Sequence, residues 1–256
     1  MMRFCLKAFL LIGYLTGCAS APHFDPGAML EPLRGEEVCR SLNQARAPIA
    51  SFRSLLDTTV VGPDGESVSF RYAAIGKGHD LMRIDVLPRE GAYTLALITI
   101  NKDEALVIDT QAKKVIEGCS PAEVLEKTLG VPGISPTTVR ALIVGQLPSL
   151  DCRSVQTYQA NPETLLLVDR EGRVAWEVAS SSQELVGARL LTESGEAIAA
   201  QVDRQRTGDQ ISLSFKIYKP LKASAELQMV KFSINRDLAD ELFTVSVPAG
   251  YSREVC

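Results

Sequence analysis

The stretch that decides the fold of this chain is Ile211-Ser212-Leu213-Ser214-Phe215-Lys216-Ile217. Apolar and polar side chains alternate along it at every position. An amphipathic helix would instead repeat its apolar residues three and four positions apart, so this period of two predicts a β-strand. One face of that strand is apolar and the other is wet, which is typical of an antiparallel sheet with one covered face.

The same alternation recurs along the chain, as at Val68, Phe70 and Tyr72. The intervening turns carry glycine or aspartate where a positive φ is needed, for example at residues 63–65 and 207–209. Strands joined by short turns predict an antiparallel meander. The expected strands are residues 52–61, 67–76, 80–87, 92–100, 104–109, 112–117, 153–159, 163–169, 173–180, 185–193, 197–206, 210–218, 226–234 and 243–247.

Helical segments are available to cover the apolar face of this sheet. Residues 36–47 place apolar side chains on one helical face. Ser120 and Pro121 are typical of an N-cap and a first helical residue, and Gly130 predicts the end of that helix. A further helix over residues 136–144 completes a helical insertion at about 120–148. A sheet with one apolar face must bury it, so we expect a mainly β fold of the α+β class with helices over the apolar face.

The N-terminus reads as an export signal. Basic residues precede an apolar run over residues 8–15, which is too short to span a bilayer as a helix. The following Leu15-Thr16-Gly17-Cys18 resembles the lipobox of bacterial lipoproteins. That resemblance implies cleavage before Cys18 and a diacylglycerol on its thiol; the alternative is an ordinary signal whose cleavage site contains a cysteine. We therefore expect a signal peptide over 1–17, the lipidated cysteine and a flexible tether over 18–35, and a folded domain over 36–256.

The residues after Cys18 indicate the membrane. They are Ala19 and Ser20. Aspartate at this place favours inner-membrane retention in many Gram-negative bacteria, and it is absent. We therefore expect a lipid anchor in the cell outer membrane with the domain facing the periplasm.

Four cysteines lie outside the signal and the lipobox: Cys39, Cys119, Cys152 and Cys256. An even number in an oxidising compartment favours disulfides, and four cysteines allow three pairings. Our preferred pairing is Cys119–Cys152, at the base of the helical insertion, with Cys39–Cys256. Metal binding is the alternative, but the spacing of these cysteines is not that of a metal site.

Composition and motifs give no support to catalysis. The chain has a formal net charge of −4 and no cluster of Lys and Arg, so no nucleic-acid partner is expected. Of its two histidines, His23 lies in the tether and His79 in a hairpin turn, and neither suits a catalytic triad. We expect a non-catalytic protein without a metal or a cofactor.

Several stretches together carry a family resemblance. They include the run Leu95-Ala96-Leu97-Ile98, the strand of residues 105–109, the segment 142–148 that ends the helical insertion, and the closing segment 242–250. This pattern resembles the outer-membrane lipoprotein receptor LolB and its LolA/LppX-like relatives. The resemblance implies an unclosed antiparallel β-barrel with helices as a lid, whose apolar interior takes lipid acyl chains.

One loop departs from that family. LolB carries an exposed leucine between a proline and a glycine, and uses it to deliver lipoproteins to the membrane. Here the loop reads Leu87-Pro88-Arg89-Glu90-Gly91, with Arg89 and Glu90 at the tip. Charged side chains insert unfavourably into hydrocarbon, so we do not expect this loop to deliver cargo to the membrane in that way.

The sequence thus predicts an envelope lipoprotein that binds acyl chains of lipids or lipoproteins, with a role in lipoprotein localisation or outer-membrane biogenesis. The alternative is a non-catalytic structural or interaction lipoprotein whose interior is filled. A shift of one residue in strand register would reverse which side chains face inward. The expected cavity-lining residues are Leu95, Leu97, Ile211, Leu213, Phe215 and Phe232.

Overall fold

The computed structural model describes residues 21–91, 93–131, 133–169, 173–218 and 222–256. The signal peptide and Cys18 lie outside these residues. In the part that is described, one open sheet contains fifteen strands. The strands are β1 (Ala28–Met29), β2 (Ser51–Val61), β3 (Ser67–Lys77), β4 (Leu81–Pro88), β5 (Ala96–Asn101), β6 (Glu104–Asp109), β7 (Lys114–Cys119), β8 (Val155–Asn161), β9 (Thr164–Asp169), β10 (Val174–Ala179), β11 (Leu185–Leu191), β12 (Ile198–Thr207), β13 (Gln210–Ile217), β14 (Ala223–Ile234) and β15 (Ser252–Val255).

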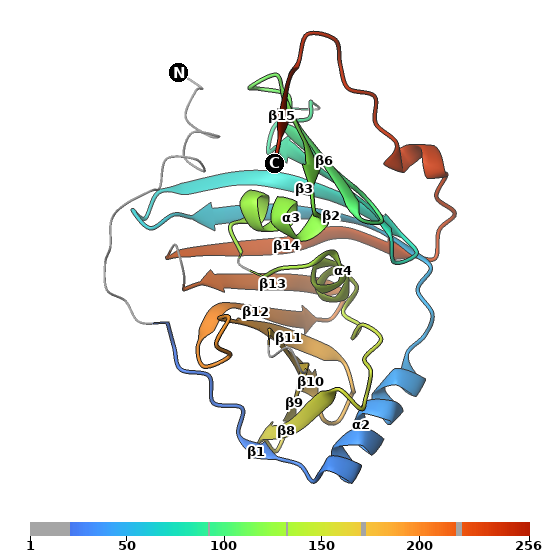
Figure 1. Ribbon diagram of the computed structural model, residues 1–256, viewed down its shortest axis with the longest axis vertical. Helices are drawn as coiled ribbons and strands as arrows, with labels where there is room; N and C mark the ends of the chain where they lie inside the picture. The colour runs from blue at the N-terminus through green and yellow to red at the C-terminus, as the bar shows by residue number, and fades with distance from the viewer. Residues whose placement is uncertain (1–20, 92, 132, 170–172, 219–221) are drawn as a thin grey trace.

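Two antiparallel meanders make up this sheet. Strands β2 to β7 form one and β8 to β14 the other, as the alternation predicts. Strand β14 then pairs antiparallel with β2 from Ser224↔Val61 to Ile234↔Phe52, and this pairing joins the two meanders in the middle of the sheet. Strand β1 extends one edge, and β15 extends the other edge by pairing parallel to β7. The prediction of an unclosed, mainly β half-barrel is confirmed (Figure 1).

The helices are α2 (Pro32–Ala45), α3 (Pro121–Leu129) and α4 (Pro136–Val144), with a 3-10 turn η1 (Asp240–Phe243). The predicted ends of α3 are confirmed: Ser120 forms a capping box with Glu123, and Gly130 ends the helix in the left-handed region at φ 66°. Ser135 caps α4 through the backbone N–H of Thr138. Helix α2 begins at Pro32, before the predicted residue 36, because proline suits the first helical turn.

Figure 1 shows α3 and α4 lying over one face of the sheet. We call this the inner face; Phe52, Leu56, Ile98 and Leu213 belong to its apolar cluster. The outer face is exposed to solvent in the middle of the sheet but buried toward both ends. Near one end, Phe24 packs on Leu166 and Ala175. Toward the other end, residues near the C-terminus pack on β5, β6 and β7. Strands that are buried on both faces have nearly continuous apolar sequences, as β5 and β10 do.

Two expectations about the chain ends are wrong. Residues 243–247 form no strand; Val245 and Val247 instead lie across the outer face against an apolar cluster, and the last strand is β15. The segment 21–35, which was expected to be part of a flexible tether, is ordered on the domain. It contains β1 and the buried Phe24, and it leads directly into α2. Both segments cover apolar outer-face side chains that would otherwise contact water.

The four cysteines form two disulfides, as predicted, but the preferred pairing is wrong. Cys39 on α2 bonds Cys152, which follows α4, and Cys119 at the end of β7 bonds Cys256. Helix α2 packs against β8, and this contact brings Cys39 to the chain that leaves the helical insertion. The parallel pairing of β15 with β7 brings Cys256 to Cys119, and the Cys256 N–H donates to the Glu117 carbonyl at 3.1 Å.

Candidate functional site

The inner face is built from every second side chain of the central strands. On β13, Ile211 and Leu213 belong to the inner apolar cluster, and Phe215 packs at its margin. Leu213 is only 1% exposed. Phe232 of β14 also packs against this cluster. The structure therefore brings four of the predicted cavity-lining residues together on one face; that a ligand contacts them stays a prediction.

Leu97 does not lie on this face. Ile98 and Ile100 of β5 belong to the inner cluster, whereas Leu97 packs with Ile108 and Val115 on the outer face. Successive side chains of a strand point to opposite faces, so the prediction for Leu97 is wrong. The continuous apolar run of β5 gave no alternation from which to choose a face.

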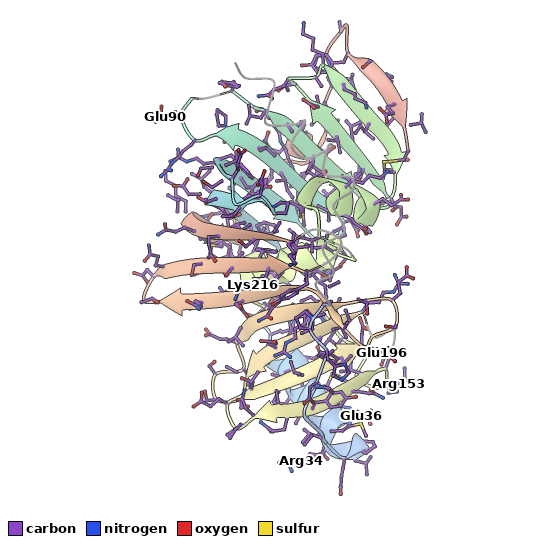
Figure 2. All side chains as sticks on the ribbon, turned by 90° about the vertical axis from the view of Figure 1, so that its left-hand side faces the viewer. Arg34, Glu36, Glu90, Arg153, Glu196 and Lys216 are labelled. Atoms are coloured by element: carbon purple, nitrogen blue, oxygen red, sulfur yellow. A yellow bond between two sulfur atoms is a disulfide. The ribbon has the colours of Figure 1, made fainter. Side chains whose placement is uncertain are left out.

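The other residues singled out in this region lie near the strand ends. Leu95 is half-buried just before β5, and its N–H donates to the Val86 carbonyl at 2.7 Å. Leu87 is half-buried on β4, opposite Arg71. Arg89 and Glu90 are exposed after β4, and Figure 2 shows Glu90 at the periphery of the molecule. The loop tip therefore presents charge to solvent.

Helices α3 and α4 form a lid over the inner face. Val124 and Leu125 of α3 are buried in the inner cluster, together with Leu142 and Ile143 of α4. These apolar positions recur at helical spacing, so each helix turns one stripe toward the sheet. Apolar contact with the sheet is the main force that holds the lid closed.

Hydrogen bonds and a cation–π contact also hold helix α4 in place. The Arg140 guanidinium donates to the Ile49 carbonyl at 2.5 Å and lies 5.5 Å from the centre of the Phe52 ring. Just beyond the helix, the Gln146 amide donates to the Ala47 carbonyl at 2.8 Å. These bonds tie the lid to the segment between α2 and β2. Burial lowers the pKa of Arg140, and the neighbouring Arg46 lowers it further.

The C-terminus of α4 rests on Arg204 of β12. A Cβ on Gly145 would lie 2.3 Å from the Arg204 Cζ, so a larger residue at this position would force the Arg204 guanidinium to move. Gly145 also has a φ of 76°, which favours glycine independently. The positive guanidinium lies at the negative end of the helix dipole, which stabilises the arrangement. Burial is the main cause that lowers the pKa of Arg204.

The lid leaves part of the inner face uncovered. Phe215, Ile217, Leu227 and Tyr72 pack against the inner cluster but are only partly buried. Figure 1 shows strands β13, β14 and β2 extending beyond the two helices. Desolvation raises the pKa of the Tyr72 hydroxyl well above its usual value. The inner face therefore offers an apolar strip beside the lid.

Two surface concavities lie away from the space beneath the lid. The larger, of about 410 Å³, has mostly outer-face polar side chains from the middle of the sheet, among them Asp57, Ser69, Ser212 and Glu226. The smaller, of about 320 Å³, lies where β2, β13 and β14 meet their turns. Beneath the lid the space is occupied by side chains that are less than 2% exposed, such as Leu125, Leu142 and Leu213. The structure thus shows the lid in a closed position.

One buried ion pair lies on the outer face, on the other side of the sheet from the lid. Glu177 pairs with Arg189 on the outer face, and burial nevertheless raises the pKa of its carboxyl. Among the residues with described positions, no three His, Cys, Asp or Glu side chains are placed to hold a metal ion. In that same part of the chain, no helix is long and apolar enough to cross a bilayer.

Sequence reasoning missed several residues of this face. Tyr72 lies in the alternation noted for its strand, and Leu227 follows the period-two pattern of β14, so both could have been counted among the lining residues. The roles of Arg140 and Arg204 could not be predicted from local sequence patterns, because their contacts join segments far apart in sequence.

Solved structures with the same architecture are found. A LolA superfamily protein from Nitrosomonas europaea aligns over 82% of this chain and 97% of its own, with a TM-score of 0.54 and 17% identity. A putative outer membrane lipoprotein-sorting protein domain from Vibrio parahaemolyticus aligns over 83% and 97%, with a TM-score of 0.52 and 8% identity. This chain has a LolA/LolB-like fold.

A third structure extends this fold group. A DUF1329 family protein from Desulfovibrio piger aligns over 86% of this chain and 98% of its own, with a TM-score of 0.58 and 10% identity. No family model matches the sequence, and no curated protein matches it. The likeness is therefore one of LolA/LolB-like fold, at low sequence identity.

Proposed function

We propose that this protein is an envelope lipoprotein that binds the acyl chains of a lipid or a lipoprotein on its inner face, in lipoprotein localisation or outer-membrane biogenesis. The observation that carries the proposal is the partly buried apolar strip of Phe215, Ile217 and Leu227 beside the lid. An acyl chain on this strip would remove apolar area from water, which contributes about 25 cal/mol per Å².

The lid supplies the second part of this mechanism. Apolar side chains fill the space beneath α3 and α4, so a chain that enters more deeply must displace one of the helices. Helix α4 is fastened by Arg140 and Gln146, whereas α3 is held mainly by the apolar contacts of Val124 and Leu125. The free energy needed to lift α3 can therefore be offset by burying the acyl chain in its place.

Location in the envelope is part of the same proposal. The segment Leu15–Cys18 supports a lipid anchor, and the two disulfides suit an oxidising compartment. The named lipoprotein-sorting neighbour supports an envelope or periplasmic setting. Two or more acyl chains hold a protein stably on a membrane, whereas a single chain does not.

A structural or interaction lipoprotein is the second candidate. The observation that favours it is the filled space beneath the lid, where Leu125 and Leu213 are almost completely buried. On this alternative the half-barrel is a scaffold, and an exposed edge or loop binds a protein partner. The presence or absence of bound lipid separates the two candidates.

Substituting Phe215 with glutamate is expected to abolish lipid retention. A carboxylate on the apolar strip would be desolvated by an acyl chain, which is strongly unfavourable. Residues 21–256, exported with a cleavable signal, would be purified and the bound lipid measured by native mass spectrometry and by solvent extraction. Wild-type protein should carry fatty acid or phospholipid, and Phe215→Glu should carry at least about tenfold less, a difference of about 1.4 kcal/mol in binding.

Lys216→Glu is the matched control, because the exposed Lys216 lies next to Phe215 on the opposite face of β13. It should keep the wild-type lipid content, and circular dichroism would establish that both variants are folded. Wild-type protein without lipid, or folded Phe215→Glu with full occupancy, contradicts acyl binding on this strip.

The anchor is tested by Cys18→Ser in the full chain. Without the thiol no thioether to diacylglycerol can form, so the domain loses its acyl chains. We expect the wild-type protein in the outer-membrane fraction and the variant outside it, as measured by sucrose-gradient fractionation and by the acyl mass on the N-terminal peptide. Membrane fractionation that does not change on substitution is incompatible with anchoring through Cys18.

A further inference from the structure

An exposed apolar tip lies at the start of the folded domain. Met29 is 60% exposed and Leu33 is 78% exposed, and Ala28 and Pro32 beside them are exposed as well. We call residues 28–33 the apolar tip; its single charged residue is Glu31, which is exposed. Other large apolar side chains with high exposure, such as Val255, lie on separate elements. Bulky apolar groups gathered at one exposed place indicate an interaction surface.

The scaffold holds this tip firmly. Strand β1 pairs with β8 through Ala28↔Gln159 and Met29↔Tyr158, and the Leu30 N–H donates to the Thr157 carbonyl at 2.9 Å. The next buried residue, Gly35, lies so close to Thr157 that a Cβ would be 3.3 Å from its side chain. The Cys39–Cys152 disulfide then fixes α2. Met29 and Leu33 are thus presented to solvent by ordered backbone.

The tip also lies at one extremity of the molecule. Figure 2 shows Arg34, the residue after the tip, at the lower end of the elongated domain. Figure 1 shows β1 and the beginning of α2 at the same end, and β15 at the other. A flat surface can therefore contact the tip.

The position of the lipobox cysteine indicates which surface the tip contacts. The lipobox cysteine is Cys18, and the described chain begins at Ala21. Three residues span about 10 Å at most when fully extended, so an acylated Cys18 holds the bilayer close to Ala21. From there the chain runs along one flank of the domain to the tip (Figure 1). Ala21 itself precedes residues that pair at the start of β12, where the Ile198 N–H donates to the Pro22 carbonyl, in the same half of the sheet as β1 and β8. The anchor therefore holds the bilayer on the half of the domain that bears Met29 and Leu33.

We propose that the apolar tip, with Met29 and Leu33 as its inserting side chains, rests in the bilayer surface that holds the lipid anchor. This inference rests on the proposed anchoring through Cys18. Apolar side chains of interfacial segments lie about 5–10 Å into the boundary between headgroups and acyl chains. Arg34 lies beside the tip, where its guanidinium can reach lipid phosphate while its stem stays near the apolar surface. Together the anchor and the tip fix the orientation of the half-barrel on the membrane.

Tryptophan quenching tests this contact. The chain has one tryptophan, Trp176, which is only 4% exposed, so a second tryptophan at an exposed position reports on its own surroundings. The mature, lipidated variants Leu33→Trp and Val255→Trp would be reconstituted into phosphatidylcholine vesicles with or without brominated acyl chains. Val255 is the control because it is 75% exposed on β15, at the opposite end.

We expect brominated lipid to quench the added emission of Leu33→Trp about twofold or more, as insertion to the acyl boundary requires. The added emission of Val255→Trp should not change. Equal emission of Leu33→Trp in both kinds of vesicle, while the protein floats with them, overturns the tip contact and leaves the anchor intact. Failure to float with vesicles overturns the anchor, and the tip inference with it. Shielding of the new tryptophan without vesicles would instead show a protein contact and overturn the membrane assignment.

Discussion

Phe52→Ala is expected to lower the free energy of unfolding by about 3–5 kcal/mol, the range for removing a buried phenylalanine. Phe52 is 0% exposed and lies on β2, at the junction of the two meanders. A Cβ on Gly76 of the neighbouring strand would lie 2.2 Å from the Phe52 ring, so the chain leaves space for this one side chain. The same ring supports the Arg140 guanidinium of the lid.

This prediction is measured by urea denaturation followed by circular dichroism. Arg53→Ala is the matched control, because the exposed Arg53 follows Phe52 on the opposite face of β2. It should change stability by no more than about 0.5 kcal/mol. Hydrogen exchange should also rise in α4 of Phe52→Ala, since Arg140 loses its support. A loss below about 1 kcal/mol would show that the junction is not as tightly packed as described.

Substituting both Cys39 and Cys152 with alanine, which removes their disulfide, is expected to lower the free energy of unfolding by about 2–5 kcal/mol. The cysteines are 113 residues apart, so the bond restricts a long stretch of the unfolded chain. In the folded protein it also ties α2 to the chain that leaves α4. The Asn43 amide reinforces that tie by donating to the Leu150 carbonyl at 2.8 Å. Thermal unfolding under non-reducing conditions measures the loss.

A double-mutant cycle tests the pairing itself. Cys39→Ala and Cys152→Ala each remove the same bond, so the double substitution should cost little more than either single one. Cys39→Ala combined with Cys256→Ala removes two separate bonds, and its cost should be nearly the sum of the single costs. Additivity in the first pair, with coupling in the second, would support the pairing Cys39–Cys256 and refute the structure at this point.

Much of the local structure was predictable from the sequence because its signals are local. The Ser120 cap and the Gly130 stop place α3 correctly, since capping depends on residues within one turn. The alternation along β13 identifies both its extended backbone and its apolar face. The resemblance to LolB-like proteins then implied the open barrel with a lid.

The errors lie where a contact between distant segments decides the outcome. Leu97 belongs to a strand that is apolar on both faces, so its direction depended on what covers β5. Val245 belongs to the segment that covers the outer face of β5 and does not join the sheet. Phe24 covers the outer face at the opposite end of the sheet in the same way. The continuous apolar sequence of β5 was itself a sign of burial on both faces.

The sequence by itself determined most of the strands, the ends of α3 and, where apolar and polar residues alternate, the apolar faces, because these follow from backbone preferences and from the spacing of apolar side chains within a few residues. Tertiary structure alone decided that β14 pairs with β2, that Cys39 meets Cys152, and that α4 rests on Arg204. Those contacts join residues far apart in the chain. Their free energy comes from surfaces that exist only once the sheet has formed, so no local pattern encodes them.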